Sequence, residues 1–319
     1  MNRNLDIWKL ELLIMTHASQ AHHEIKIAEY FFSNFDFLLN AGKTIFSFLR
    51  LVSIFTGMTG FFVTFMAFIL LGANPDIIVC FSVFLMTFSV YSINKLTDIK
   101  EDTINMPERL SFIEGRKRLV LGYSLAAYGF SVLLAFRENP SNIPILFIPL
   151  ASNALYSIKL VPGVPRFKDI PVMKNLFVAL SWTLVCTLMP ALHLRFQSST
   201  YLLIIIFFIF IKLFINAALY DKRDVKGDRE NGIRTLPVLL GPKKTAGVLL
   251  ILNTTLLPYF SFADHGIRAI FISLILYGYA YTTCFSVLRS PQLLDFFVDG
   301  EWMLASIVLM AIRYCGLLS

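Results

Sequence analysis

The sequence predicts an all-α membrane protein, a polytopic helical bundle with about nine transmembrane helices. Of its 319 residues, 56% are hydrophobic and only 15% are charged, whereas an average soluble domain has roughly 25% charged residues. Apolar runs of roughly 16 to 28 residues recur along the chain, and such runs are long enough to cross a hydrocarbon core of about 30 Å. Most of the basic residues lie in or at the edges of the gaps between these runs. The net charge of +7 therefore indicates membrane topology and not a nucleic-acid partner.

The N-terminal segment differs from the rest of the chain. Leu5, Trp8 and Leu12 recur at helical spacing, while charged residues interrupt any apolar core. This pattern is typical of amphipathic helices that lie on a membrane surface. We therefore expect a surface segment over 1–43 and a membrane domain over 44–319.

Nine apolar runs follow, and their composition suits transmembrane helices. They are rich in Leu, Ile, Phe and Ala, and they lack the ten-residue segments of alternating hydrophobicity that mark a membrane β-barrel. The runs cover residues 45–72, 76–97, 117–136, 143–158, 172–193, 201–220, 245–263, 267–289 and 302–318.

Lys and Arg are unevenly distributed among the gaps between the runs. The gaps after the second, fourth and sixth runs hold most of them, whereas the alternate gaps contribute only Arg137, Arg195 and Arg268. Positively charged loops of membrane proteins face the cytoplasm. We therefore expect these three gaps and the N-terminus on the cytoplasmic side of a cell membrane, with the C-terminus outside.

Two groups of acidic residues lie on this predicted cytoplasmic side, each at the end of an apolar run. Offsets of four and eight in the first group, and of three and seven in the second, place each group on one face of a helix. The first acidic group is Asn94, Asp98 and Asp102, and the second acidic group is Asp221, Asp224 and Asp228. Stacked carboxylates repel one another unless a cation lies among them, and oxygen ligands of this kind suit Mg²⁺. The alternative is that these acids merely balance neighbouring Lys and Arg in solvated loops.

Two basic residues lie inside apolar runs, Arg50 in the first run and Lys212 in the sixth. Charges inside a membrane are costly and are functional candidates by default. Lys212 precedes Asp228 by 16 residues, or about 24 Å along a helix, which is too far for both to contact one phosphate. We therefore expect Lys212 to extend toward the opposite membrane interface. The alternative is a role in a polar cavity inside the bundle.

The sequence around the acidic groups resembles the UbiA superfamily of intramembrane prenyltransferases. Its members carry an N-D-x-x-D-x-x-x-D motif after the second of nine helices and a D-x-x-x-D motif after the sixth. The first acidic group matches the first motif and is followed by N-x-P-x-R at 105–109, while the second group and Gly227 match the second motif and precede a similar G-I-R-T-L-P sequence at 232–237. Lys95 departs from the pattern, because it stands where the family commonly has a third acid. We therefore expect fewer carboxylates around the first metal ion.

The resemblance implies transfer of a polyprenyl group from polyprenyl diphosphate to a small acceptor within membrane lipid, with aromatic compounds as the expected acceptors and Mg²⁺ as the cofactor. It implies that the catalytic, metal-binding carboxylates are Asp98, Asp102, Asp224 and Asp228. It implies substrate binding by Arg50, Asn94, Tyr156, Lys168, Lys174 and Asp221, of which Asn94 and Asp221 also support the metal. Lys168 and Lys174 are explained equally well by the positive charge of cytoplasmic loops.

The physical chemistry of the reaction agrees with this interpretation. Cleavage of an allylic carbon–oxygen bond produces a carbocation and a diphosphate, whose charge metal ions and nearby cations stabilise. Within the same chemistry, a terpene cyclase or a prenyl diphosphate hydrolase is an alternative, since there the carbocation reacts internally or with water. A non-catalytic lipid-binding or transport bundle is a further alternative. Transporters place polar groups near the membrane midplane, whereas here the acids lie at one face.

Overall fold

The computed structural model describes residues 42–157, 170–262, 265–287 and 291–314. The chain divides into two compact units, Met1–Arg50 and Leu51–Ser319. Most of the predicted surface segment over 1–43 lies outside the described residues, so its structure and its boundary stay predictions.

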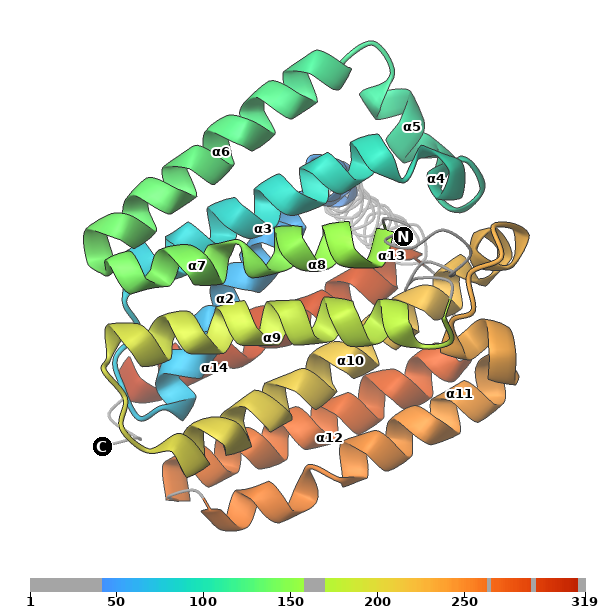
Figure 1. Ribbon diagram of the computed structural model, residues 1–319. Coiled ribbons are helices and arrows are strands. Elements are labelled where there is room, and N and C mark those ends of the chain that lie inside the picture. Colours follow the sequence, from blue (N-terminus) through green and yellow to red (C-terminus); the bar gives the residue numbers. More distant parts are fainter. Residues whose placement is uncertain (1–41, 158–169, 263–264, 288–290, 315–319) are drawn as a thin grey trace, which may run out of the picture. The chain divides into compact units, whose positions relative to one another are not determined.

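The described residues of the second unit lie mainly in helices (Figure 1). Its α-helices are α2 (Ile54–Leu70), α3 (Ile77–Thr97), α4 (Ile99–Asn105), α5 (Pro107–Ile113), α6 (Lys117–Glu138), α7 (Ile143–Leu146), α8 (Ile148–Ser157), α9 (Met173–His193), α10 (Ser199–Glu230), α11 (Leu236–Thr254), α12 (His265–Val287), α13 (Pro291–Leu294) and α14 (Gly300–Tyr314). Shorter helical turns are the 3₁₀ segments η1 (Pro140–Asn142) and η3 (Leu257–Phe262) and the π-helix η4 (Asp295–Asp299).

Within the described residues, five helices are long and apolar enough to cross a membrane, namely α3, α6, α9, α10 and the Ile267–Phe285 part of α12. A sixth span results when the helix Gly42–Leu51 and α2 are counted as one broken span. These helices agree with the prediction of an all-α membrane bundle. The count of nine spans stays a prediction.

The fourth predicted run, 143–158, is not one helix in the structure, because it is divided between α7 and α8. Each of these helices carries a proline near its beginning, Pro144 in α7 and Pro149 in α8. Proline has no N–H group to donate to the preceding turn, so a helix that reaches it is interrupted.

Serine side chains join α3 to α6. The Ser82 hydroxyl donates to the Ser131 carbonyl at 2.9 Å, and the Ser131 hydroxyl donates back to the Ser82 carbonyl at 2.7 Å. Closer to the C-terminal end of α3, the Ser89 hydroxyl donates to the Ser124 carbonyl at 2.7 Å. Small residues let membrane helices approach closely, and their hydroxyls bond across the interface. These contacts hold α3, whose C-terminal end carries the first acidic group.

Apolar side chains fill the interior of the second unit and also cover part of its outside. Trp302 and Phe68 are fully buried, whereas Leu119 and Leu133 of α6 are about two-thirds exposed at 65% and 64%. An apolar helix with an exposed apolar face is typical of contact with lipid.

The two acidic groups lie at the same end of the second unit, where α4 packs against the C-terminal part of α10 (Figure 1). Helix α10 has 32 residues and is therefore about 48 Å long. This length exceeds the hydrocarbon core of about 30 Å. The last turns of α10, which carry the second acidic group, therefore extend beyond the apolar part of the helix.

Candidate active site

The first acidic group lies where α3 ends and α4 begins. Asn94 is in the last turn of α3, Asp98 is the residue between the two helices, and the buried Asp102 is in α4. The Thr97 hydroxyl donates to the Asn94 carbonyl at 3.0 Å, a local bond of the kind that competes with a continuous helix. The helix is therefore interrupted at Asp98, although the backbone N–H groups of Asp98 and Asp102 still donate to the carbonyls four residues earlier, each at 2.9 Å. That the three side chains share one face stays a prediction.

The second acidic group lies on α10, which continues unbroken through all three residues, as their spacing predicts. Asp221 and Asp228 are buried. Lys174, from the first turn of α9, places its Nζ atom 2.9 Å from Asp221 Oδ1 and 3.4 Å from Asp228 Oδ1. Asn175 donates from Nδ2 to Asp221 Oδ2 at 2.6 Å. One lysine therefore bridges two carboxylates of this group.

A direct contact between α4 and α10 brings the two acidic groups together. The backbone N–H of Gly227 donates to Asn105 Oδ1 at 3.0 Å. Across this junction, burial raises the pKa of Asp102, the paired Arg109 opposes that shift, and the charge of Asp224 raises the pKa further. Arg109 contacts both Asp102 oxygens at 3.1 Å. Asp102 and Asp224 are thus close enough to influence each other electrostatically.

Two residues that sequence reasoning missed complete the second acidic group. Arg223 donates from Nε and Nη2 to the two oxygens of Asp224 at 2.7 and 2.8 Å, and from Nη1 to Asp295 Oδ1 at 3.2 Å. Arg223 lies between Asp221 and Asp224 in the sequence, and this position inside the second motif could have indicated its role. Asp295 follows α13, far along the sequence, and only the tertiary structure brings it to this site.

Two buried oxygen atoms at the second acidic group are of types that a divalent cation accepts. Among the described residues, Asp228 Oδ2 and Asn175 Oδ1 are buried and have no hydrogen-bond partner. Unpaired buried oxygens are costly, and carboxylate and amide oxygens are ligands that Mg²⁺ accepts. The donor set is therefore chemically suited to Mg²⁺.

The carboxylates of the acidic groups are spread out. In the described part of the chain, the one cluster of three His, Cys, Asp or Glu residues with ligand atoms within 4.8 Å of one another is Asp76, Glu138 and His193, at the opposite end of α3. The carboxylates of the second acidic group instead contact Lys174 and Arg223, and Asp102 of the first group contacts Arg109. Mg²⁺ commonly takes one or two carboxylates and completes its shell with water and substrate phosphates, so a more open arrangement suits it.

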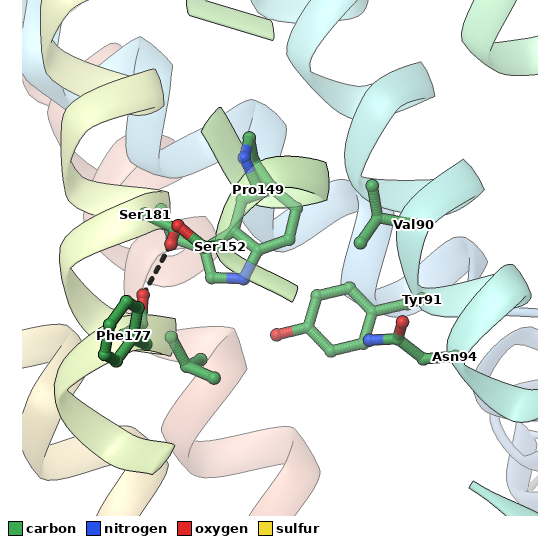
Figure 2. Close-up of a pocket in the computed structure, with 9 residues that line it drawn as sticks. Val90, Tyr91, Asn94, Pro149, Ser152, Phe177 and Ser181 are labelled. Carbon is green, nitrogen blue, oxygen red and sulfur yellow. Dashed lines mark hydrogen bonds between the residues drawn. The ribbon is translucent and has the colours of Figure 1, made fainter. Parts of the chain in front are cut away.

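A cavity of about 60 Å³ adjoins Asn94, between α3, α8 and α9. Figure 2 shows Tyr91 and Asn94 on one side of this cavity and Phe177 and Ser181 on the other. The Tyr91 ring stacks on Trp182 with 5.4 Å between ring centroids. The lining is mostly apolar and aromatic beside one amide of the first acidic group, which suits a hydrocarbon or aromatic ligand with a polar end.

The roles of three further residues that the sequence predicts to bind substrate stay predictions. Lys168 and the side chain of Tyr156 lie outside the described residues. Arg50 ends the first unit, whereas the acidic groups belong to the second. Their contacts with a diphosphate stay predictions.

The prediction for Lys212 is wrong. This side chain does not extend to a membrane interface but is fully buried, with Nζ 2.5 Å from Glu301 Oε1. It also donates to the Leu274 carbonyl at 2.8 Å and lies 4.9 Å from the ring centroid of Tyr281. The reason is an acid on a distant helix, since Glu301 belongs to α14 and offers the lysine an ionic partner inside the bundle.

The sequence is similar to enzymes from archaea and plants. Digeranylgeranylglyceryl phosphate synthase of Sulfolobus acidocaldarius is 29% identical over 182 residues, which are 53% of this chain and 61% of that protein. The chloroplastic 2-acylphloroglucinol 4-prenyltransferase of Humulus lupulus is 29% identical over 178 residues, which are 52% of this chain and 42% of that protein. The matches thus span less than two-thirds of the length of these relatives.

The fold is shared with solved structures at low sequence identity. A UbiA homolog from Archaeoglobus fulgidus, bound to GPP and Mg²⁺, superposes with a TM-score of 0.58 and 18% identity, covering 82% of this chain and 99% of the other. The apo UbiA homolog from Aeropyrum pernix K1 gives a TM-score of 0.60 and 15% identity, covering 81% and 98%. Residues 47–294 match the model of the UbiA prenyltransferase family. The chain therefore belongs to the UbiA prenyltransferase family.

Proposed function

We propose that the protein is a Mg²⁺-dependent prenyltransferase that moves a polyprenyl group from polyprenyl diphosphate to a small acceptor inside a membrane. The observation that carries the proposal is the meeting of the two acidic groups at the contact between Gly227 and Asn105, beside unpaired buried oxygens of Asp228 and Asn175. Membership of a prenyltransferase family supports the reaction class. Aromatic compounds are the expected acceptors.

Mg²⁺ in this proposal is held by four carboxylates and supported by two further residues. The carboxylates are Asp98, Asp102, Asp224 and Asp228, and the supporting residues are Asn94 and Asp221. When bound, Mg²⁺ supplies positive charge that stabilises the departing diphosphate. Support for this metal comes from the donor types of the site and from the fold shared with a UbiA homolog described as bound to GPP and Mg²⁺.

The protein's own side chains orient the acids and add positive charge. Lys174 contacts Asp221 and Asp228 from α9, so it fixes the spacing of these two carboxylates. Its charge also favours an anion at the same place. Arg50, Tyr156 and Lys168 complete the proposed set of substrate-binding residues.

The cavity beside Asn94 provides an apolar place for substrate next to the metal-binding residues. Its volume is about 60 Å³, whereas an engineered cavity that binds benzene measures about 150 Å³. Admission of an isoprene unit or an aromatic ring therefore requires its walls, including the stacked Tyr91 and Trp182, to move apart. An apolar lining excludes water, which protects the carbocation from hydrolysis.

The proposed membrane arrangement places the acidic groups on the cytoplasmic side of a cell membrane. It has nine spans in the domain 44–319 and an amphipathic surface segment over 1–43. The positive charge of the loops after the second, fourth and sixth runs supports this orientation.

The reaction is tested with detergent-solubilised full-length protein. Geranyl, farnesyl and geranylgeranyl diphosphates are offered with a hydroxybenzoate, an acylphloroglucinol and a geranylgeranylglyceryl phosphate. Released diphosphate and prenylated products are quantified while Mg²⁺ is titrated. Prenylated product together with stoichiometric diphosphate supports the proposal. A free prenol or a cyclised terpene in its place contradicts transfer, and absence of diphosphate release from every donor contradicts an enzyme of this class.

Two variants link the reaction to the acidic groups. Asp98→Asn and Asp224→Asn keep the size of the side chain but remove one negative charge each. Loss of about 3 to 4 kcal/mol of transition-state stabilisation slows turnover roughly a hundredfold to a thousandfold, while the fold persists. Glu230→Gln is the matched control, because Glu230 is an exposed acid at the end of the same helix. Near-normal turnover of both Asp variants at low Mg²⁺ contradicts the assignment of the metal site.

A further inference from the structure

Arg223 lies within the second acidic group and is held on three sides. Both oxygens of Asp224 accept hydrogen bonds from it, at 2.7 and 2.8 Å, and Asp295 accepts a third at 3.2 Å. Its guanidinium carbon lies 5.1 Å from the ring centroid of Tyr220. The side chain is only 16% exposed. A guanidinium held in this way is preorganised, so it loses little further freedom when it binds a ligand.

Asp295 adds a contact from outside the two sequence motifs. It is buried and opens the π-helix Asp295–Asp299, just after the residues matched by the family model, which end at 294. π-helical turns are rare and are frequently found at functional sites. The fold therefore uses an irregular turn to place a carboxylate opposite Arg223.

The guanidinium of Arg223 retains unused hydrogen-bond donors. Arginine has five N–H groups and remains charged in proteins. Three of them are directed at Asp224 and Asp295, which leaves two without a partner among the described residues. Arginine pairs well with phosphate oxygens. Two free donors beside the acidic groups therefore suit an oxygen of a diphosphate.

We propose that Arg223, positioned by Asp295, binds the diphosphate and competes with the metal ion for the carboxylate of Asp224. This inference rests on the proposed function, since it requires the diphosphate to bind between the acidic groups. Arg223 already contacts both oxygens of Asp224, so a divalent cation at Asp224 meets a fixed positive charge. Arg223 thus strengthens diphosphate binding and weakens metal binding.

The variant Arg223→Gln separates these two effects, because glutamine keeps hydrogen-bonding capacity but has no charge. Mn²⁺ binding is expected to tighten, since Asp224 loses its positive neighbour. Binding of geranyl thiodiphosphate without metal is expected to weaken at least tenfold, since charge-assisted hydrogen bonds to the diphosphate are lost. A residue with only a structural role would weaken both affinities or neither. The opposite signs are therefore diagnostic.

Both affinities are measured on full-length protein in detergent. Electron paramagnetic resonance follows free Mn²⁺, and isothermal titration calorimetry in EDTA follows the non-cleavable geranyl thiodiphosphate. Lys226→Gln is the matched control, because it removes one positive charge from an exposed position on the same helix and should leave both affinities unchanged. Asp295→Asn keeps Arg223 but weakens its anchor, and should reduce analogue binding less than Arg223→Gln does. If Arg223→Gln does not fold, Asp295→Asn replaces it, and analogue binding by Asp295→Asn that equals that of the wild-type protein then overturns the inference.

The outcomes distinguish this inference from the proposed function. Opposite changes in the two affinities of Arg223→Gln, with an unchanged Lys226→Gln, support the inference. Unchanged or parallel affinities overturn it, and so does analogue binding by the wild-type protein that requires Mn²⁺. A wild-type protein that binds neither Mn²⁺ nor the analogue contradicts the proposed function itself.

Discussion

Replacement of Gly227 by alanine tests whether close packing of α4 on α10 aligns the acidic groups. A Cβ atom at this position would lie 2.4 Å from Nδ2, 2.5 Å from Oδ1 and 2.6 Å from Cγ of Asn105. Ordinary contact between heavy atoms needs about 3.5 Å, so the Asn105 side chain has to move by about 1 Å. Its hydrogen bond from the Gly227 N–H, now 3.0 Å long, is then lost.

The energetic cost follows from these contacts. The lost hydrogen bond costs about 1 kcal/mol and the overpacking about 1 to 3 kcal/mol, while the higher helix propensity of alanine returns about 1 kcal/mol. We expect Gly227→Ala to lower the free energy of unfolding by about 1 to 3 kcal/mol. Turnover by the folded variant should also fall, by up to about a hundredfold, since a displacement of about 1 Å at a reacting centre can slow catalysis by that factor.

Unfolding in detergent and prenyl transfer at saturating Mg²⁺ measure the two effects. Gly122→Ala is the control, because Gly122 is also helical but a Cβ atom there meets nothing within 4 Å. Asn105→Ala combined with Gly227→Ala removes the clash and should recover the stability lost to overpacking. Equal stability and turnover of Gly227→Ala and Gly122→Ala would refute the reasoning, as would a double variant no more stable than Gly227→Ala.

Three other predictions concern topology, the first unit and the buried ion pair. Single cysteines at Lys226 and Pro75, in a cysteine-free background, should react with a membrane-impermeant reagent from opposite sides of sealed vesicles; labelling from the same side contradicts the topology. Arg50→Ala should weaken diphosphate binding by about 1.5 to 3 kcal/mol without changing the unfolding temperature, and an unchanged affinity returns Arg50 to a structural role. Lys212→Met should destabilise the protein by about 3 to 5 kcal/mol, because it leaves Glu301 buried and unpaired, and adding Glu301→Leu should restore most of the loss. Equal stability of the single and double variants excludes an energetic coupling between the two residues.

The acidic groups show what residue spacing alone can predict about the position of side chains on a helix. The spacing of Asp221, Asp224 and Asp228 predicts one helix face, and α10 provides it. At Asp98 the helix is interrupted, because α3 ends before this residue and α4 begins after it. Spacing assumes a continuous helix, whereas a local bond from the Thr97 hydroxyl to the backbone favours an interruption that periodicity does not reveal.

The charged partners of these acids were less accessible to sequence analysis. The family resemblance predicts that Lys174 binds substrate. Its contacts with two carboxylates of α10 depend on the packing of α9 beside that helix, which the sequence does not predict. Lys212 was misassigned because its ion pair depends on Glu301, which is remote in sequence and enters the bundle on α14. A buried lysine pairs with an acid that is close to it in space. The number of residues between the two in the sequence does not predict that distance.

The sequence by itself determined the all-α membrane class of the protein, several of its long apolar helices and the order of its two acidic groups. These properties depend on local composition and periodicity, because each apolar run must satisfy its own backbone hydrogen bonds within a membrane. Only the tertiary structure decided which basic side chain pairs with which acid, including the pair of Arg223 and Asp295. It also decided that the Asn105 side chain packs directly against Gly227. Each of these contacts joins elements that are distant in the chain, and its geometry is set by how the helices pack against one another.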